Sequence, residues 1–110
     1  MPYSDFKLTS IIRRIIVQMN LDVNKLNISV INGVAYIDGT VEKTDPHIHK
    51  LKSKYYYDNA ILEKKLEKEY KSSLKMMDRN IINAPGIRGA VYKFEEWKKT
   101  SAGGWIKKSQ

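Results

Sequence analysis

Five cationic residues in the second half of the chain recur at spacings of four, three, four and four. At 100° per residue, these spacings place one stripe of positive charge on a single face of an α-helix. Neighbouring lysines on such a face repel one another, so a stripe kept despite that repulsion is typical of an anion-binding surface. Lipid headgroups and nucleic-acid phosphates are the candidate ligands, and a solvated lysine face is the alternative. The stripe consists of Lys64, Lys68, Lys71, Lys75 and Arg79.

A second candidate segment lies just before that helix and combines aromatic rings with cations. Such a mixture stacks on bases or sits at a membrane interface. Three adjacent tyrosines cannot all face inward, and the alternative is that one or two of them pack on the core while another shields an edge. The candidate interaction segment comprises Lys50, Lys52, Lys54, Tyr55, Tyr56 and Tyr57.

Catalytic and metal-binding patterns are weak. Asp45, His47 and His49 could present three ligands on one side of an extended segment, but no fourth ligand is visible and Pro46 suits a loop. The sequence shows no nucleophile beside a base, no paired carboxylates on one face and no phosphate loop. We therefore expect no enzymatic activity, no metal, no cofactor and no small-molecule substrate.

Two amphipathic helices are predicted to position the candidate residues. Ser4 or Asp5 can cap a helix over about 5–19, and Asn59 begins a longer helix over about 59–83 that Ala84-Pro85-Gly86 ends. In each helix, apolar residues fall at spacings of three and four, which indicates one buried stripe. These residues are Leu8, Ile11, Ile12, Ile15, Ile16 and Met19 in the first helix, and Leu62, Leu66, Tyr70, Leu74, Met77 and Ile81 in the second.

The clearest strand signal is the stretch around Asn32-Gly33. Alternating apolar residues flank this pair, and Asn-Gly tolerates the positive φ that a type I′ turn needs at both central positions. We predict antiparallel strands at about 27–31 and 34–41, with Gly39 marking a bulge or a close backbone approach. A third strand is predicted within 87–97, after Gly86.

Composition and charge set the remaining expectations. The chain has 110 residues, no cysteine and a formal net charge of +8, which favours polyanionic partners. Residues 42–58 read as a partly ordered, inserted connection, and 98–110 as a flexible basic tail. No run is long and apolar enough to span a membrane, and no export signal is visible, which predicts a cytoplasmic protein.

The order of elements resembles the BON domain, a small bacterial αββαβ module. The resemblance covers about residues 6–94, and it departs from the family at the inserted segment 42–58, in a second helix that is not alanine-rich, and in the lack of an Asn after Val91. The residues that carry it are Ile28, Val30, Asn32, Gly33, Val34, Ile37, Gly39 and Val41, and after the helix Pro85, Gly86, Ile87 and Val91.

The resemblance implies an αββαβ domain over 1–97, with a three-stranded sheet and two helices packed on one face. It also implies a non-enzymatic module of the cell envelope that binds phospholipid surfaces or mediates assembly, with Asn32, Gly33, Gly39 and Gly86 shaping the backbone. An envelope location would apply to a chain trimmed of its signal peptide. We therefore expect a binding or assembly module that contacts an anionic membrane surface or a protein partner. Backbone-directed nucleic-acid binding is the alternative, and self-association through a sheet edge stays open.

Overall fold

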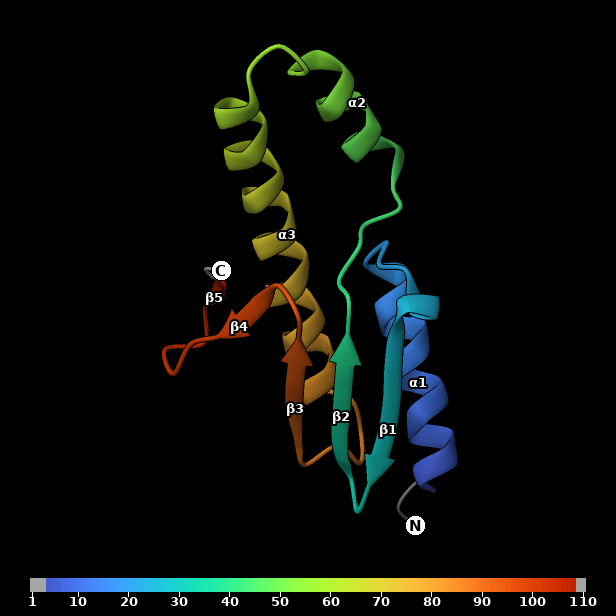
Figure 1. The fold of residues 1–110 in the computed structure, drawn as a ribbon. Coiled ribbons are helices and arrows are strands. Elements are labelled where there is room, and N and C mark those ends of the chain that lie inside the picture. Colours follow the sequence, from blue (N-terminus) through green and yellow to red (C-terminus); the bar gives the residue numbers. More distant parts are fainter. Residues whose placement is uncertain (1–3, 109–110) are drawn as a thin grey trace.

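A computed structural model describes residues 4–108 and contains the expected α+β fold with additional elements (Figure 1). The order helix, strand, strand, helix, strand is confirmed. The chain also contains a short 3₁₀ helix, a further α-helix and a small second sheet. The elements are α1 Asp5–Gln18, η1 Val23–Lys25, β1 Leu26–Ile31, β2 Val34–Gly39, α2 Pro46–Lys54, α3 Asn59–Ile82, β3 Gly89–Phe94, β4 Trp97–Lys99 and β5 Trp105–Lys107.

α1 begins where the sequence provides a cap. The Ser4 side chain accepts a hydrogen bond from the Lys7 backbone N–H at 3.2 Å, which satisfies one of the free donors of the first turn. One side of the helix then faces the sheet and buries Leu8, Ile12 and Ile16 completely or nearly so. The predicted apolar stripe is therefore the surface by which α1 packs.

β1 and β2 form an antiparallel hairpin whose turn is Asn32-Gly33. Their φ angles of 52° and 79° are those of a type I′ turn. Gly39, at φ 120°, ends β2 so close to the preceding strand that an added Cβ would lie 2.4 Å from the Lys25 carbonyl oxygen. A side chain at position 39 would therefore both strain the backbone and displace the start of β1.

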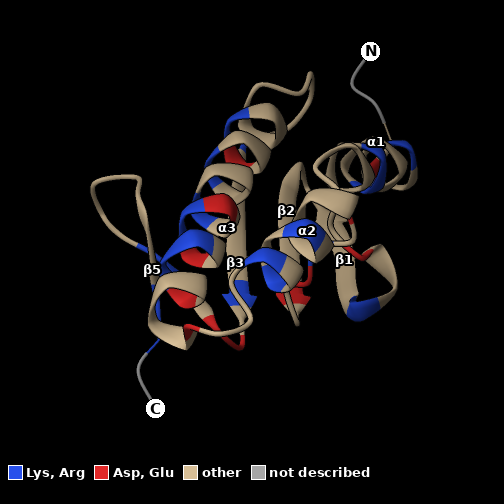
Figure 2. Ribbon diagram, turned by 90° about the horizontal axis from the view of Figure 1, so that it is seen from above, with Lys and Arg blue, Asp and Glu red and all other residues tan. Residues whose placement is uncertain are grey.

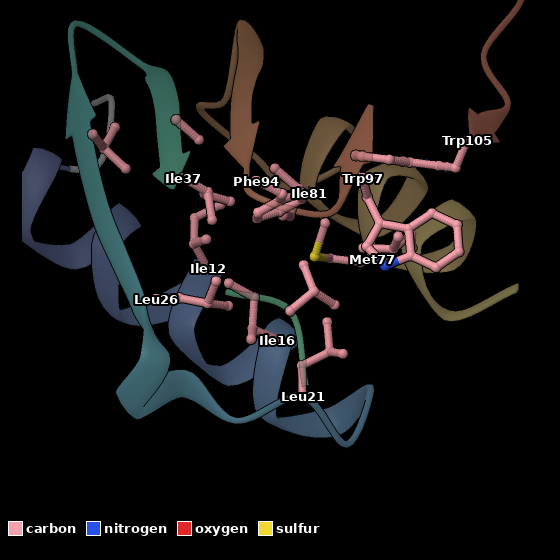
Figure 3. Close-up of a cluster of buried hydrophobic side chains, with 14 of the residues drawn as sticks. Ile12, Ile16, Leu21, Leu26, Ile37, Met77, Ile81, Phe94, Trp97 and Trp105 are labelled. Carbon is pink, nitrogen blue, oxygen red and sulfur yellow. The ribbon is translucent and has the colours of Figure 1, made fainter. Parts of the chain in front are cut away.

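The main sheet has the strand order β1-β2-β3, and β3 runs parallel to β2. Figure 1 shows the strands on one side, with α1 and the second half of α3 behind them. The core lies between these two layers, and Figure 3 shows its side chains converging from both. They include Ile12, Ile16, Ile37, Met77, Ile81 and Phe94. The prediction of helices on one face of the sheet is confirmed.

The first half of α3 and all of α2 project beyond the sheet as a helical hairpin, which we call the arm (residues 46–71; Figure 1). The arm gives the molecule its length of 54 Å against 28 and 20 Å in the other directions. α2 begins with Pro46 in its first turn and buries Ile48 and Leu51. The expected partly ordered connection over 42–58 thus contains a regular helix, because these two residues pack toward α3.

The C-terminal segment differs from the expected flexible tail. Residues 97–107 form the hairpin β4–β5, which buries Trp97 and Trp105. The Trp105 ring lies 5.2 Å from the Tyr92 ring and 5.8 Å from the Phe94 ring. Gly103, at φ 89°, lies in the turn of this hairpin, within the segment that the sequence predicts to be a flexible tail. The domain therefore extends past residue 97, and only residues 109–110 of the predicted tail lie outside the described part.

Candidate functional site

α3 carries the predicted cationic stripe on the side that faces away from the core. Its first turn is capped by Asp58, whose carboxylate accepts a hydrogen bond from the Ile61 backbone N–H at 3.2 Å. Core packing by Leu74, Met77 and Ile81 then fixes the rotation of the helix, so the opposite face points to solvent. Figure 2 shows Lys and Arg positions along α3 and on α2.

Most of the stripe is free of acidic partners. Lys64, Lys68, Lys75 and Arg79 are exposed, and none of them forms an ion pair with another residue of 4–108. Lys71 is half-buried and pairs with Glu67 across one helical turn, with Nζ and Oε1 2.9 Å apart. Four of the five predicted cations are thus available to an external anion, whereas Lys71 is partly neutralised.

The three tyrosines occupy the tip of the arm, where the chain turns from α2 into α3. Tyr56 and Tyr57 are 76% and 71% exposed, and their rings meet edge to face at 5.9 Å. Tyr55 instead packs inward, with the ammonium groups of Lys54 and Lys65 5.4 and 5.3 Å from its ring centroid. One tyrosine therefore holds the tip together while two present their rings to solvent.

A cavity of about 480 Å³ opens between α2 and α3 next to the tip. Its walls are formed by residues of both helices and of the turn between them. Leu51, Tyr55 and Ile61 supply apolar surface. The cationic side chains around it come from Lys64, Lys65 and Lys68. Sequence reasoning missed Lys65, which lies one residue from the predicted stripe and turns toward α2. Its only local signal was the Lys64-Lys65 doublet.

His47 also borders this cavity and contacts α3. Its Nε2 lies 3.2 Å from Oε1 of Glu69 on α3, so the contact ties α2 to α3. Within 4–108, no three His, Asp or Glu side chains are grouped as a metal site would require. Asp45, His47 and His49 do not present their side chains on one side, because the two histidines lie on a helix and not on an extended segment.

The base of the arm is fixed to the body by a buried polar cluster around Lys43. The Lys43 ammonium donates to the Ser73 hydroxyl at 2.5 Å and lies 3.7 Å from the Asp45 carboxylate. The Lys43 backbone N–H donates to the Tyr70 hydroxyl at 3.0 Å, and the Tyr70 ring stacks on Trp97 at 6.0 Å. Burial raises the pKa of the Tyr70 hydroxyl. These contacts hold the arm in a defined direction relative to the sheet.

The arm as a whole is positive and uses only lysine for its cations. Residues 46–71 hold seven lysines against four acidic residues, and contain no arginine. Lysine acts as a hydrated point charge, whereas arginine gives the planar, bidentate contacts that read individual phosphates and bases. The arm is therefore suited to a diffuse negative surface more than to recognition of a single phosphate.

No family model, no curated protein and no solved structure matches this chain. Among the described residues, no helix is long and apolar enough to cross a membrane.

Proposed function

We propose that this chain, which resembles BON domains, is a non-enzymatic binding module and that its arm docks onto anionic phospholipid surfaces. The observation that carries the proposal is the tip of the arm, where two exposed tyrosine rings stand beside lysines that lack acidic partners. Tyrosine is enriched at the membrane–water interface because its ring is apolar and its hydroxyl can stay hydrated.

The expected strength follows from the number of lysines that the tip can bring to a surface. Lys54, Lys64, Lys65 and Lys68 belong to the end of the arm that carries Tyr56 and Tyr57. Each lysine near an anionic leaflet contributes about 1 kcal/mol at physiological ionic strength. Four of them support reversible peripheral attachment, with the tyrosine rings seated at the level of the headgroups and no helix inserted.

Backbone-directed nucleic-acid binding is the second candidate, and the length of the stripe favours it. Lys64 and Arg79 are separated by about 22 Å along α3 at 1.5 Å per residue. That span could follow several successive phosphates. Four free cations would give a slope of about −3.6 in a plot of log affinity against log salt on duplex DNA. A tip-directed lipid interaction requires no such binding to DNA.

A charge-reversal experiment with a matched control tests the lipid proposal. The double variant Lys64→Glu/Lys68→Glu lowers the net charge from +8 to +4, and so does Arg13→Glu/Arg14→Glu on the exposed side of α1, away from the arm. Flotation with vesicles that contain anionic lipid should show at least roughly 30-fold weaker binding for the arm variant, because two attractive lysines are worth about 2 kcal/mol.

The α1 variant should keep most of the affinity of the natural chain. Equal losses in the two variants would mean that binding follows total charge and does not involve the arm. Binding to neutral and anionic vesicles alike would also refute the proposal. Tight, salt-dependent retention of duplex DNA without vesicle binding would favour the second candidate.

A further inference from the structure

The outer face of the main sheet, opposite α1 and α3, is partly apolar and is not covered by any element within residues 4–108. Side chains alternate along the strands, so Ile31, Tyr36 and Val91 point away from the core and are exposed. This face holds a shallow hollow of about 290 Å³ that is lined by residues of all three strands. β2 and β3 pair in parallel, whereas β1 and β2 are antiparallel. Apolar side chains that lie exposed together on one face of a protein mark interaction sites. This face is thus expected to have a partner.

The charge on this face suits a second copy of the chain as the partner. A molecule with a net charge of +8 repels its own copies over most of its surface. The outward positions of the three strands, however, carry one acid and one base, Asp38 and Lys93, and are otherwise uncharged. Two copies can therefore approach through this face without bringing like charges together.

The register of β2 and β3 makes the face self-complementary. The two strands run in the same direction and pair Tyr36 with Val91 and Asp38 with Lys93. A two-fold axis parallel to the strands and midway between them exchanges β2 of one copy with β3 of the other, without changing height along the strand. Such an axis places Tyr36 opposite Val91 of the partner subunit, and Asp38 opposite Lys93 of the partner subunit, twice per dimer.

We propose that the chain forms a two-fold homodimer through the outer face of its sheet, with Tyr36 and Val91 at the centre of the contact. The arm projects beyond the ends of β2 and β3 toward which both strands run (Figure 1). Because the axis is parallel to the strands, both arms then project from the same end of the dimer. Two tips on one side allow bivalent attachment to a flat surface, a consequence that rests on the proposed function of the arm.

The size of the face sets the strength of the dimer. Six residues per strand and three strands span about 20 by 14 Å. The face therefore offers about 280 Å² per copy, well below the roughly 800 Å² per partner of stable interfaces, so the association should be weak, depend on concentration and reverse readily. Sedimentation velocity between about 10 µM and 1 mM covers the range in which such a dimer appears.

Two variants test the contact and its geometry. Val91→Lys puts a charge at the centre of the face and should leave a monomer throughout that range. Ile106→Lys, at an exposed position of β5, should dimerise like the natural chain. Asp38→Lys should weaken the dimer at least tenfold because lysines then face each other. The double exchange Asp38→Lys/Lys93→Asp should restore it. Far-UV circular dichroism verifies that each variant is folded.

A natural chain that stays monomeric at 1 mM, or a Val91→Lys variant that dimerises as well as the natural chain, would overturn the proposal. Failure of the double exchange to restore the dimer would overturn the two-fold register. The arm variant Lys64→Glu/Lys68→Glu should dimerise normally even if it no longer binds vesicles. Sedimentation therefore tests the dimer, and vesicle flotation tests the arm proposal, independently of each other.

Discussion

Replacing Trp105 by alanine should strongly lower the free energy of unfolding, because the β4–β5 hairpin belongs to the core. Trp105 is 4% exposed and packs on the Tyr92 and Phe94 rings. A buried aromatic side chain removes about 150–250 Å² from water, which at about 25 cal/mol per Å² corresponds to roughly 4–6 kcal/mol. This range is an upper bound, since the unfolded chain already buries part of that area.

Measured losses for removing large aromatic residues from cores are about 3–5 kcal/mol, so we expect Trp105→Ala to lower the free energy of unfolding by about 3–4 kcal/mol. Trp105→Phe should cost less, about 1 kcal/mol, because the indole Nε1 is buried without a hydrogen-bond partner among the described residues. The phenylalanine variant loses some packing, but it also removes a buried N–H group whose missing hydrogen bond is unfavourable in the natural chain.

Urea unfolding followed by circular dichroism measures both effects, and Ile106→Ala is the matched control. Ile106 is next to Trp105 on the same strand but 47% exposed, so its loss should be below about 1 kcal/mol. If Trp105→Ala and Ile106→Ala cost the same small amount, the hairpin does not pack on the core. In that case, the flexible tail expected from the sequence would be the better description.

Two further predictions concern buried polar groups. Lys43→Met leaves the Asp45 carboxylate without its cation and should lower the free energy of unfolding, measured in urea, by about 3 kcal/mol. Adding Asp45→Asn to this variant should partly reverse the loss. An unchanged free energy of unfolding in Lys43→Met would contradict a buried ion pair. Burial, reinforced by its hydrogen bond to Asp78, raises the pKa of the Tyr92 hydroxyl well above its usual value. This group therefore stabilises the fold below its unfolded pKa of about 10, and its contribution falls as pH rises further. Unfolding of Tyr92→Phe between about pH 8 and 11 should show a shallower alkaline loss than the natural chain, and equal slopes would refute this assignment.

The hairpin and the two main helices could be predicted because their signals are local. Asn32-Gly33 specifies a turn from two residues, and the spacing of Leu74, Met77 and Ile81 specifies a buried helix face. The same periodicity located the exposed cations on α3. These features need no information about which other segment of the chain packs against them.

The elements that could not be predicted depend on contacts between distant residues. Gly103-Gly104 is equally compatible with a linker and a turn, and only the packing of Trp105 on Tyr92 and Phe94 distinguishes them. α2 had weak local signals, namely Pro46 in a first turn and the spacing of Ile48 and Leu51.

The cavity of the candidate site was unpredictable for the same reason. It depends on how α2 folds back along α3, which brings Tyr55 beside Lys65 and His47 beside Glu69. The stripe was therefore visible in the sequence, whereas the projecting arm that carries three of its five residues was not.

The most direct test of the central claim is to ask which end of the molecule meets the membrane. The chain has no cysteine, so Tyr57→Cys allows one environment-sensitive fluorophore at the tip of the arm. Phe6→Cys, at a position 84% exposed near the start of α1, places the same label at the opposite end of the long axis (Figure 1).

Anionic vesicles should shift the emission of the label at position 57 to shorter wavelength and leave the label at position 6 unchanged, and neutral vesicles should affect neither. If the protein floats with anionic vesicles while the label at position 57 does not respond, or while the label at position 6 responds instead, the arm is not the part that binds the membrane.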